Sequence, residues 1–198
     1  MVLKLFRGIE AIWYYIWGNI FALIIYDKKF VRGKYFLGRY GPIGGIGWKW
    51  IVTDFQSRVI LGINRGVPFP ISPRVSATIP QNIDFHVDDL NNFQAAGCYF
   101  QAYNNGRIII GKGTWIAPNV GIIASNHDLL DPDKHLEGKQ VIIGEKCWIG
   151  MNSVILPEVI LGQHTVVGAG SIVTKSFPEG YCIIAGNPAR KIRDVIHN

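Results

Sequence analysis

The sequence VIIGEKCWIGMNSVILPEVILGQHTVVGAGSIVT, residues 141–174, decides the fold because a large aliphatic residue recurs at every sixth position. This spacing is neither the 3.6-residue period of a helix nor the two-residue alternation of a strand. A chain that turns a corner every six residues, and so stacks its strands into a parallel solenoid, produces such a register. The aliphatic positions are Ile110, Ile116, Ile122, Ile143, Ile149, Ile155, Leu161, Val167 and Val173.

Small residues accompany each aliphatic position. The residue that follows is usually Gly or Ala, and the fourth residue on is small or β-branched. Small residues let the backbone turn sharply, and strands about 4.8 Å apart would stack the coils at ordinary sheet spacing. The register therefore predicts a mainly β fold, a parallel β-helix over residues 71–178.

Other segments flank the repeat. We expect a helical, basic and aromatic segment at residues 1–37, a linker with the first irregular coils at residues 38–70, and a short C-terminal tail at residues 179–198. Two clusters of Gly and Pro favour the linker. The first coils are degenerate, as is typical of the terminal repeats that cap a solenoid.

The net charge of +6 is concentrated near the N-terminus, where residues 1–40 hold seven basic residues against two acidic ones, a net charge of +5. Between the charges, residues 9–26 are apolar and rich in aromatic residues, which predicts a helix. This stretch barely reaches the length of a membrane span, and flanking Lys with embedded Trp and Tyr is typical of a helix in a membrane interface. Three interpretations stay open: packing on the solenoid or a partner subunit, contact of residues 4–34 with a membrane surface, and a true span. No signal-peptide cleavage pattern follows.

Composition argues against several other classes. Three cysteines at scattered spacing give no disulfide framework and no metal-ligand pattern, so a reducing compartment is the simpler interpretation. His127 and His135 lack the spacing of a metal site, and we expect no metal. The basic charge comes without a nucleic-acid-binding motif, so we expect no nucleic-acid partner.

The six-residue register breaks once. After Ile122 it resumes only at Ile143, which leaves a polar, charged insertion loop at residues 128–142. A solenoid accommodates an insertion as a loop that leaves one corner, and such loops commonly carry functional residues. His127 stands at the root of the loop, where a neutral imidazole could accept a proton from a substrate. A hydrogen-bonded structural histidine is the alternative that the residues alone leave open.

Four strings, at residues 126–128, 147–150, 168–175 and 185–190, resemble the hexapeptide-repeat acyltransferases. The likeness covers about residues 75–195 and is strongest to sugar O-acetyltransferases of surface-polysaccharide biosynthesis, of the colanic-acid type. The resemblance implies a left-handed, three-sided β-helix, a homotrimer with active sites between subunits, and acetyl-CoA as the acyl donor.

The resemblance also implies roles for individual residues. It makes His127 the catalytic base, and the Asn126 side chain is one candidate oxyanion donor beside backbone N–H groups. The expected coenzyme A contacts are Trp148, Met151, Ala169, Thr174, Lys175, Arg190 and Arg193. The expected acceptor contacts are Asn92, Gln94, Gln101, Asn104, Asn105 and Asp128, although amide-rich turns of a solenoid explain several of these equally well.

Transfer without an acyl-enzyme is favoured, because the sequence has no serine elbow and no cysteine–histidine signature. We therefore expect an acetyl-CoA-dependent O-acetyltransferase that modifies a sugar hydroxyl in polysaccharide, capsule or lipopolysaccharide biosynthesis. The expected acceptor is a sugar or lipid-linked glycan, and the expected location is the cytoplasm or the inner face of the membrane. The alternatives are N-acetylation of an amino sugar and a non-catalytic scaffold solenoid.

Overall fold

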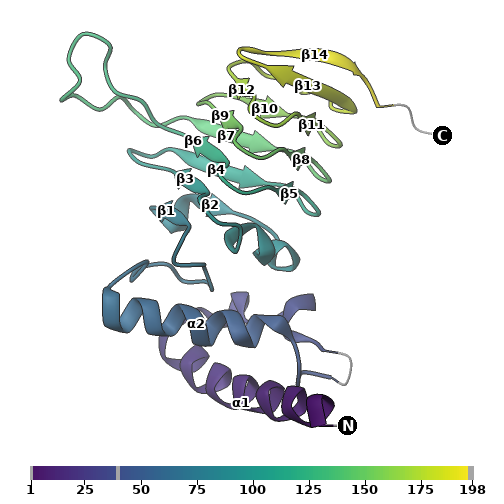
Figure 1. Cartoon of the computed structure of the whole chain (residues 1–198). Coiled ribbons are helices and arrows are strands. Elements are labelled where there is room, and N and C mark those ends of the chain that lie inside the picture. The colour runs from purple at the N-terminus through teal and green to yellow at the C-terminus, as the bar shows by residue number, and fades with distance from the viewer. Residues whose placement is uncertain (1, 39–40, 196–198) are drawn as a thin grey trace. The chain divides into compact units, whose positions relative to one another are not determined.

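The computed structural model describes residues 2–38 and 41–195, and the chain divides into two compact units, Met1–Pro73 and Arg74–Asn198 (Figure 1). The first unit is helical and the second is built almost entirely of short strands. Each unit has its own buried core.

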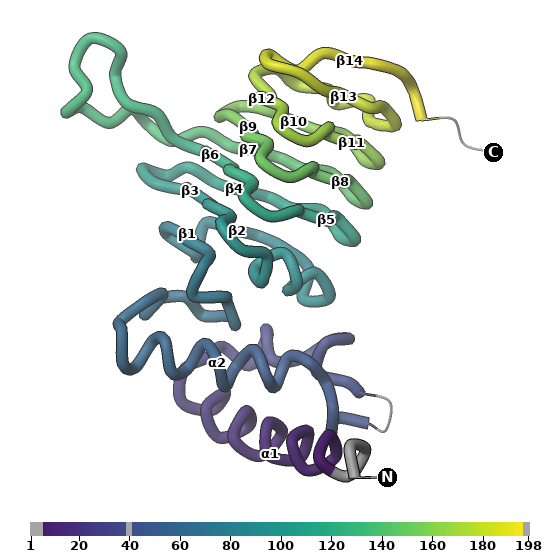
Figure 2. The backbone as a smooth tube through the Cα atoms, viewed as in Figure 1, coloured from purple at the N-terminus to yellow at the C-terminus, as the bar shows by residue number. Residues whose placement is uncertain are grey.

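Two helices form the N-terminal unit. Helix α1, Val2–Ile25, and helix α2, Ile46–Leu61, lie side by side and run in the same direction (Figure 2). The rings of Phe21 and Phe55 stack between them with centroids 3.7 Å apart. Gly18 lets the helices approach closely, because a Cβ there would lie 3.0 Å from the Trp48 ring. The segment that connects the end of α1 to the start of α2 contains two 3₁₀ turns, η1 at Lys28–Phe30 and η2 at Lys34–Phe36.

Helix α2 lies within residues 38–70, where the sequence predicted a linker, and that part of the prediction was wrong. The helix lacks a clear apolar stripe because its buried side includes the charged residues Asp54 and Arg58. Hydrophobic periodicity, the main signal for an amphipathic helix, is therefore weak in this segment.

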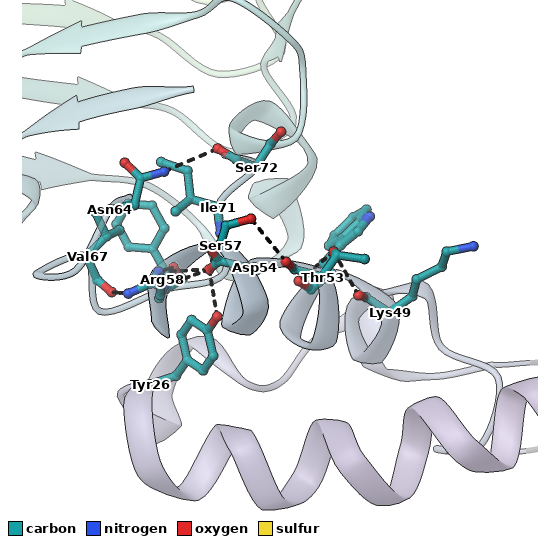
Figure 3. Close-up of polar contacts among 12 residues, drawn as sticks. Tyr26, Lys49, Thr53, Asp54, Ser57, Arg58, Asn64, Val67, Ile71 and Ser72 are labelled. Atoms are coloured by element: carbon teal, nitrogen blue, oxygen red, sulfur yellow. Dashed lines mark hydrogen bonds and ion pairs between the residues drawn. The ribbon is translucent and has the colours of Figure 1, made fainter. Parts of the chain in front are cut away.

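A buried ionic network holds the N-terminal unit together (Figure 3). The Asp54 Oδ2 atom accepts hydrogen bonds from the Tyr26 hydroxyl at 2.6 Å and from Arg58 Nε at 2.9 Å. It also accepts one from the Ile71 backbone N–H at 3.2 Å. Arg58 in turn donates to the carbonyls of Val67 and Phe69 at 2.6 and 2.9 Å. Burial raises the pKa of Tyr26 well above its ordinary value, and the neighbouring Asp54 carboxylate adds to the rise.

The C-terminal unit is a parallel β-helix with three sheets. The first sheet contains β1 Ser76–Thr78, β3 Tyr99–Gln101, β6 Gly121–Ile123, β9 Val154–Ile155 and β12 Ile172–Val173. The second contains β2 Ile83–Asp84, β4 Arg107–Ile110, β7 Gln140–Ile143 and β10 Ile160–Leu161. The third contains β5 Trp115–Ile116, β8 Trp148–Ile149, β11 Val166–Val167, β13 Cys182–Gly186 and β14 Ala189–Asp194.

The predicted register is confirmed by burial, because each of the nine aliphatic positions is at most 5% exposed. Residues at equivalent positions stack on one another, as Ile116 does on Ile149. The small residue after the aliphatic is required at the corners of the second sheet. At Gly144, for example, a Cβ would lie 2.6 Å from the Gln163 backbone nitrogen of the next coil.

A 3₁₀ segment, η4 Val87–Phe93, replaces a strand in the first coil of the third sheet. Asn92 is 1% exposed, and its side-chain amide bonds the backbone of β5 as a strand would. Its Nδ2 donates to the Thr114 carbonyl at 2.9 Å, and its Oδ1 accepts from the Ile116 N–H at 3.0 Å. One side chain therefore takes the place of a further strand beside β5, at the N-terminal end of the third sheet.

Residues 179–198, predicted as a tail, contain the hairpin of β13 and β14. Strand β13 pairs in parallel with β11 and continues the third sheet, and β14 adds antiparallel to β13. Ile184 lies opposite Val167 in this pairing, one residue before the register position at residue 185. Because Ile184 comes one residue early, a strict six-residue pattern does not detect this last coil.

Candidate functional site

The insertion after β6 forms an arm that projects away from the coils and returns at β7, with an antiparallel bridge between His127 and His135 (Figure 1). The Asp128 N–H donates to the Lys134 carbonyl at 2.8 Å, and the Leu136 N–H donates to the Asn126 carbonyl at 3.0 Å. The Asp128 carboxylate accepts from the backbone N–H of Leu130 at 2.8 Å and closes the turn at the tip. The carboxylate predicted to contact the acceptor thus also stabilises the arm itself.

His127 has a defined tautomer in this arm. Its Nδ1 lies 2.6 Å from the Pro132 carbonyl oxygen. A carbonyl oxygen can only accept a hydrogen bond, so in the neutral ring the proton resides on Nδ1. The Nε2 atom then carries a lone pair and can accept a proton. The His135 ring packs against this imidazole, with centroids 4.3 Å apart, and both residues are exposed in the single chain.

Asn126 is also exposed, one residue before the histidine. Its backbone is fixed by the hydrogen bond that its carbonyl accepts from Leu136. This bond constrains the backbone at the point where the arm leaves the coil.

The corner between β3 and β4 lies against the root of the arm. Asn104 and Asn105 have φ values of +49° and +67°, a turn conformation that asparagine tolerates better than most residues. The Asn104 Nδ2 donates to the Leu136 carbonyl at 3.3 Å, and the Gly138 N–H donates to the Asn104 carbonyl at 2.6 Å. Asn104 thus both forms the turn and bonds the returning side of the arm at Leu136 and Gly138.

Gln101 lies on β3, and its Oε1 atom is buried without a hydrogen-bond partner among the described residues. Its backbone carbonyl accepts from the Ala124 N–H at 2.8 Å, which places this residue next to the strand that leads into His127.

Asn92 cannot reach a ligand, because the side chain is buried and both of its amide groups bond β5. The predicted acceptor contact at this position is therefore corrected to a structural one. Gln94 follows as the C-terminal cap of η4, where its backbone N–H donates to the Asn91 carbonyl at 2.9 Å.

The predicted coenzyme A residues lie in three places on the chain, and all are exposed. Thr174 and Lys175 lie at the corner after β12, which is the corner from which the arm leaves after β6. The corner with Thr174 and Lys175 is two coils away from the root of the arm, or about 10 Å at sheet spacing. Met151 and Ala169 share the corner between the third and first sheets, where the Gly170 N–H donates to the Met151 carbonyl at 2.8 Å. The third place is the outer surface of the third sheet and its hairpin, with Trp148, Arg190 and Arg193.

Sequence reasoning missed the neighbour of Trp148. Trp115 pairs with it in register on the third sheet, and the two side chains are 60% and 59% exposed. They line a hollow of about 350 Å³ together with Gly113, Lys146 and Cys147. The signal was available in the sequence, because both tryptophans directly precede an aliphatic register position.

The three cysteines are buried, and burial raises the pKa of each thiol. Their thiolate forms, which would be needed for nucleophilic attack, are therefore disfavoured. No group of three or more His, Cys, Asp or Glu side chains within residues 2–38 and 41–195 is arranged to hold a metal ion.

The sequence pattern of the bacterial transferase hexapeptide family, described as six repeats, matches residues 140–175. A protein of Escherichia coli (strain K12) named "Putative colanic acid biosynthesis acetyltransferase WcaF" is 31% identical over 135 residues, which are 68% of this chain and 71% of the relative. The chain belongs to the hexapeptide-repeat acetyltransferase family. The predicted resemblance is confirmed, and the β-helix of this hexapeptide-repeat protein is the left-handed one of its family.

Two further relatives carry names that specify a sugar. The galactoside O-acetyltransferase of Escherichia coli (strain K12) is 38% identical over 91 residues, 44% of each chain. The solved structure of a galactoside acetyltransferase in complex with coenzyme A has a TM-score of 0.53 and 32% identity, over 64% of the hexapeptide-repeat protein and 61% of that chain. The matched segments thus span between 44% and 71% of the lengths of these relatives.

Proposed function

We propose that the protein is an acetyl-CoA-dependent O-acetyltransferase that acts on a sugar hydroxyl in the biosynthesis of a polysaccharide, capsule or lipopolysaccharide. One observation carries the proposal: His127 stands at the root of the arm with Nδ1 bonded to the Pro132 carbonyl, which leaves Nε2 as the proton acceptor. Membership of a family whose relatives are named sugar O-acetyltransferases supports the reaction class.

In the proposed reaction, Nε2 removes the hydroxyl proton while the sugar oxygen attacks the thioester carbonyl of acetyl-CoA. The tetrahedral intermediate then expels the coenzyme A sulfur, and the imidazolium returns the proton to it, so that an acetyl ester and free coenzyme A result. A positioned base of this kind contributes about 10²–10⁴-fold in rate. The Pro132 carbonyl holds the ring in place through its contact with Nδ1.

The developing oxyanion needs a donor, for which we propose the Asn126 side chain or a backbone N–H of a coil corner. Direct transfer in a ternary complex is favoured over an acyl-enzyme, because the buried cysteine thiols are held protonated. No covalent intermediate is then expected.

Coenzyme A binding is proposed along the last coils, in a groove between subunits of a homotrimer. Lys175, Arg190 and Arg193 are exposed cations that suit its phosphates. Within one chain the remaining candidates, Trp148, Met151, Ala169 and Thr174, lie on different corners and faces. An inter-subunit groove would bring such separate surfaces together.

Acceptor binding is proposed at the base of the arm, through Gln101 and Asn104, with Asn105, Gln94 and Asp128 as further contacts. The support for this place is positional: the Gln101 carbonyl accepts from the Ala124 N–H, and the Asn104 Nδ2 donates to the Leu136 carbonyl at the returning side of the arm. We propose that the acceptor is a lipid-linked or nucleotide-linked glycan, and that the enzyme works in the cytoplasm at the inner face of the membrane.

Release of free thiol from acetyl-CoA, measured across free, nucleotide-linked and lipid-linked sugars and amino sugars, tests the proposal. At least one hydroxyl acceptor should be turned over, and the His127→Ala variant should lose about 10²–10⁴-fold in kcat while it still binds coenzyme A. The matched control is His164→Asn, because His164 has a φ of +57° that asparagine tolerates and lies in another coil. Transfer only to amino groups would favour the N-acetyltransferase, and no turnover of any acceptor by wild type would favour the scaffold.

A further inference from the structure

Helix α1 exposes one continuous apolar side, which we call the outer face. Its members recur at intervals of three and four residues, so they lie on one side of the helix over about 27 Å. They are 41–73% exposed, and none is charged. The outer face consists of Phe6, Ile9, Ile12, Trp13, Ile16, Trp17, Ile20, Leu23 and Ile24.

The opposite side of α1 is the one that packs on α2. Gly18 contacts the Trp48 ring, the rings of Phe21 and Phe55 stack, and Glu10 forms an ion pair with Lys49 at 3.7 Å. The window Phe6–Ile25 is long and apolar enough to cross a membrane, yet only 11% of it is buried. The outer face is therefore not the core side of this helix.

The apolar surface continues at the C-terminal ends of the two helices and meets cations there. A hollow of about 540 Å³ is lined by Ile24, Ile25 and Val59 together with the exposed Arg65. Lys28 and Lys29 lie within four residues of the end of α1 and are exposed, and Lys29 forms an ion pair with Asp27 at 3.5 Å. An apolar face beside exposed cations matches a bilayer surface, where acyl chains and anionic headgroups adjoin.

Two other occupants fit this face less well. If α1 spanned a bilayer, the parallel α2 would carry Lys49 and Gln56 into the hydrocarbon, at a high cost in free energy. If a second copy covered the face, two N-terminal segments of net charge +5 would be brought together. A helix that lies in the plane of an anionic interface avoids both costs.

We propose that the outer face of α1 docks the N-terminal unit on an anionic lipid bilayer, with the helix axis parallel to the membrane surface. The acyl chains receive the apolar side chains, while α2 stays on the aqueous side of α1. Of the three interpretations that the sequence left open for residues 9–26, the structure favours this one. The docking goes beyond the proposed transfer reaction and is tested without it.

Vesicle flotation with the full chain tests the docking. With vesicles of two parts phosphatidylcholine to one part phosphatidylglycerol, wild type should float with the lipid, and binding should fall several-fold with phosphatidylcholine alone or at high salt. Ile16→Gln, which changes no charge, should weaken partitioning about tenfold, because a buried aliphatic side chain is lost from the lipid. The matched control is Ile160→Gln, an exposed isoleucine of the β-helix, which should bind as wild type does.

Circular dichroism and light scattering accompany the flotation, so that misfolding and changes of assembly are detected. Unchanged helix content in Ile16→Gln, together with weakened binding, supports the docking. The proposal is overturned if wild type does not bind anionic vesicles, or if Ile16→Gln binds as tightly as wild type. It is also overturned if Ile16→Gln instead lowers the molecular mass in solution, since a second copy would then cover the outer face.

Discussion

Replacement of Asn92 by Ala separates the acceptor role that the sequence suggested from the structural role. The Asn92 amide bonds the Thr114 carbonyl and the Ile116 N–H at 2.9 and 3.0 Å, and the side chain is 1% exposed. Alanine removes both partners and leaves a buried donor and a buried acceptor unsatisfied. Each such group costs about 1–3 kcal/mol, so the β-helix should lose about 2–6 kcal/mol of stability.

Two measurements check this expectation. The free energy of unfolding, from denaturant titration, should fall by that amount. Amide hydrogen exchange should accelerate at Ile116, while the Trp148 amide, which donates to the Thr165 carbonyl at 3.0 Å in an interior coil, stays protected. Acetyl transfer by the folded variant should keep the KM of wild type for the acceptor.

An Asn92→Asp variant sharpens the test. The carboxylate keeps an acceptor for the Ile116 N–H but places a second oxygen against the Thr114 carbonyl, and it buries a charge. It should be at least as destabilising as alanine. Unchanged stability of Asn92→Ala, combined with a raised KM for the acceptor, would refute the structural assignment.

Other regions of the chain allow further predictions. Arg58→Met leaves the Asp54 carboxylate buried without its cation, so the N-terminal unit should lose about 3–5 kcal/mol, which limited proteolysis of residues 1–73 detects. Gly144→Ala should cost about 1–3 kcal/mol, because its Cβ would lie 2.6 Å from a backbone nitrogen, whereas Gly121→Ala, with its nearest contact at 3.6 Å, should be close to neutral in thermal unfolding. The raised pKa of Tyr26 means that the unfolded chain releases this proton first, so stability is retained below about pH 10 and falls above it, and Tyr26→Phe should flatten that fall in unfolding titrations. The three buried thiols should react with a disulfide reagent much more slowly than in the unfolded chain at the same pH, and fast labelling of the folded protein would contradict their burial.

The β-helix was predictable because its register is local and redundant. A residue such as Ile149 stacks on Ile116 one coil away, so the same requirement for an aliphatic side chain is repeated along the sequence. The segments that escaped prediction obey non-repeating constraints. Helix α2 buries Asp54 and Arg58, and these residues are stabilised only by partners that a pattern of hydrophobicity does not show.

The position of His127 in the fold was predictable, and its contacts were not. The break in the register located His127 at the root of the arm, and the structure places it there. Its tautomer depends on the Pro132 carbonyl, which the fold of the arm brings to the ring, and no sequence spacing indicates such a contact. Asn92 illustrates the reverse case: an amide at a turn has the chemistry of a sugar contact, and only its burial reveals the other role.

The way in which the third sheet ends has a consequence for aggregation. Stacked parallel strands expose unpaired backbone groups at both ends, and such edges template end-to-end fibre growth. At one end, the Asn92 side chain bonds the Thr114 carbonyl and the Ile116 N–H, and the Asp89 carboxylate accepts from the Gly113 N–H, so these backbone groups are not available to another strand. At the other end, β14 reverses direction and presents Arg190, Lys191 and Arg193 as exposed, charged side chains. Loss of either cap should therefore expose an edge of the third sheet to pairing with another chain.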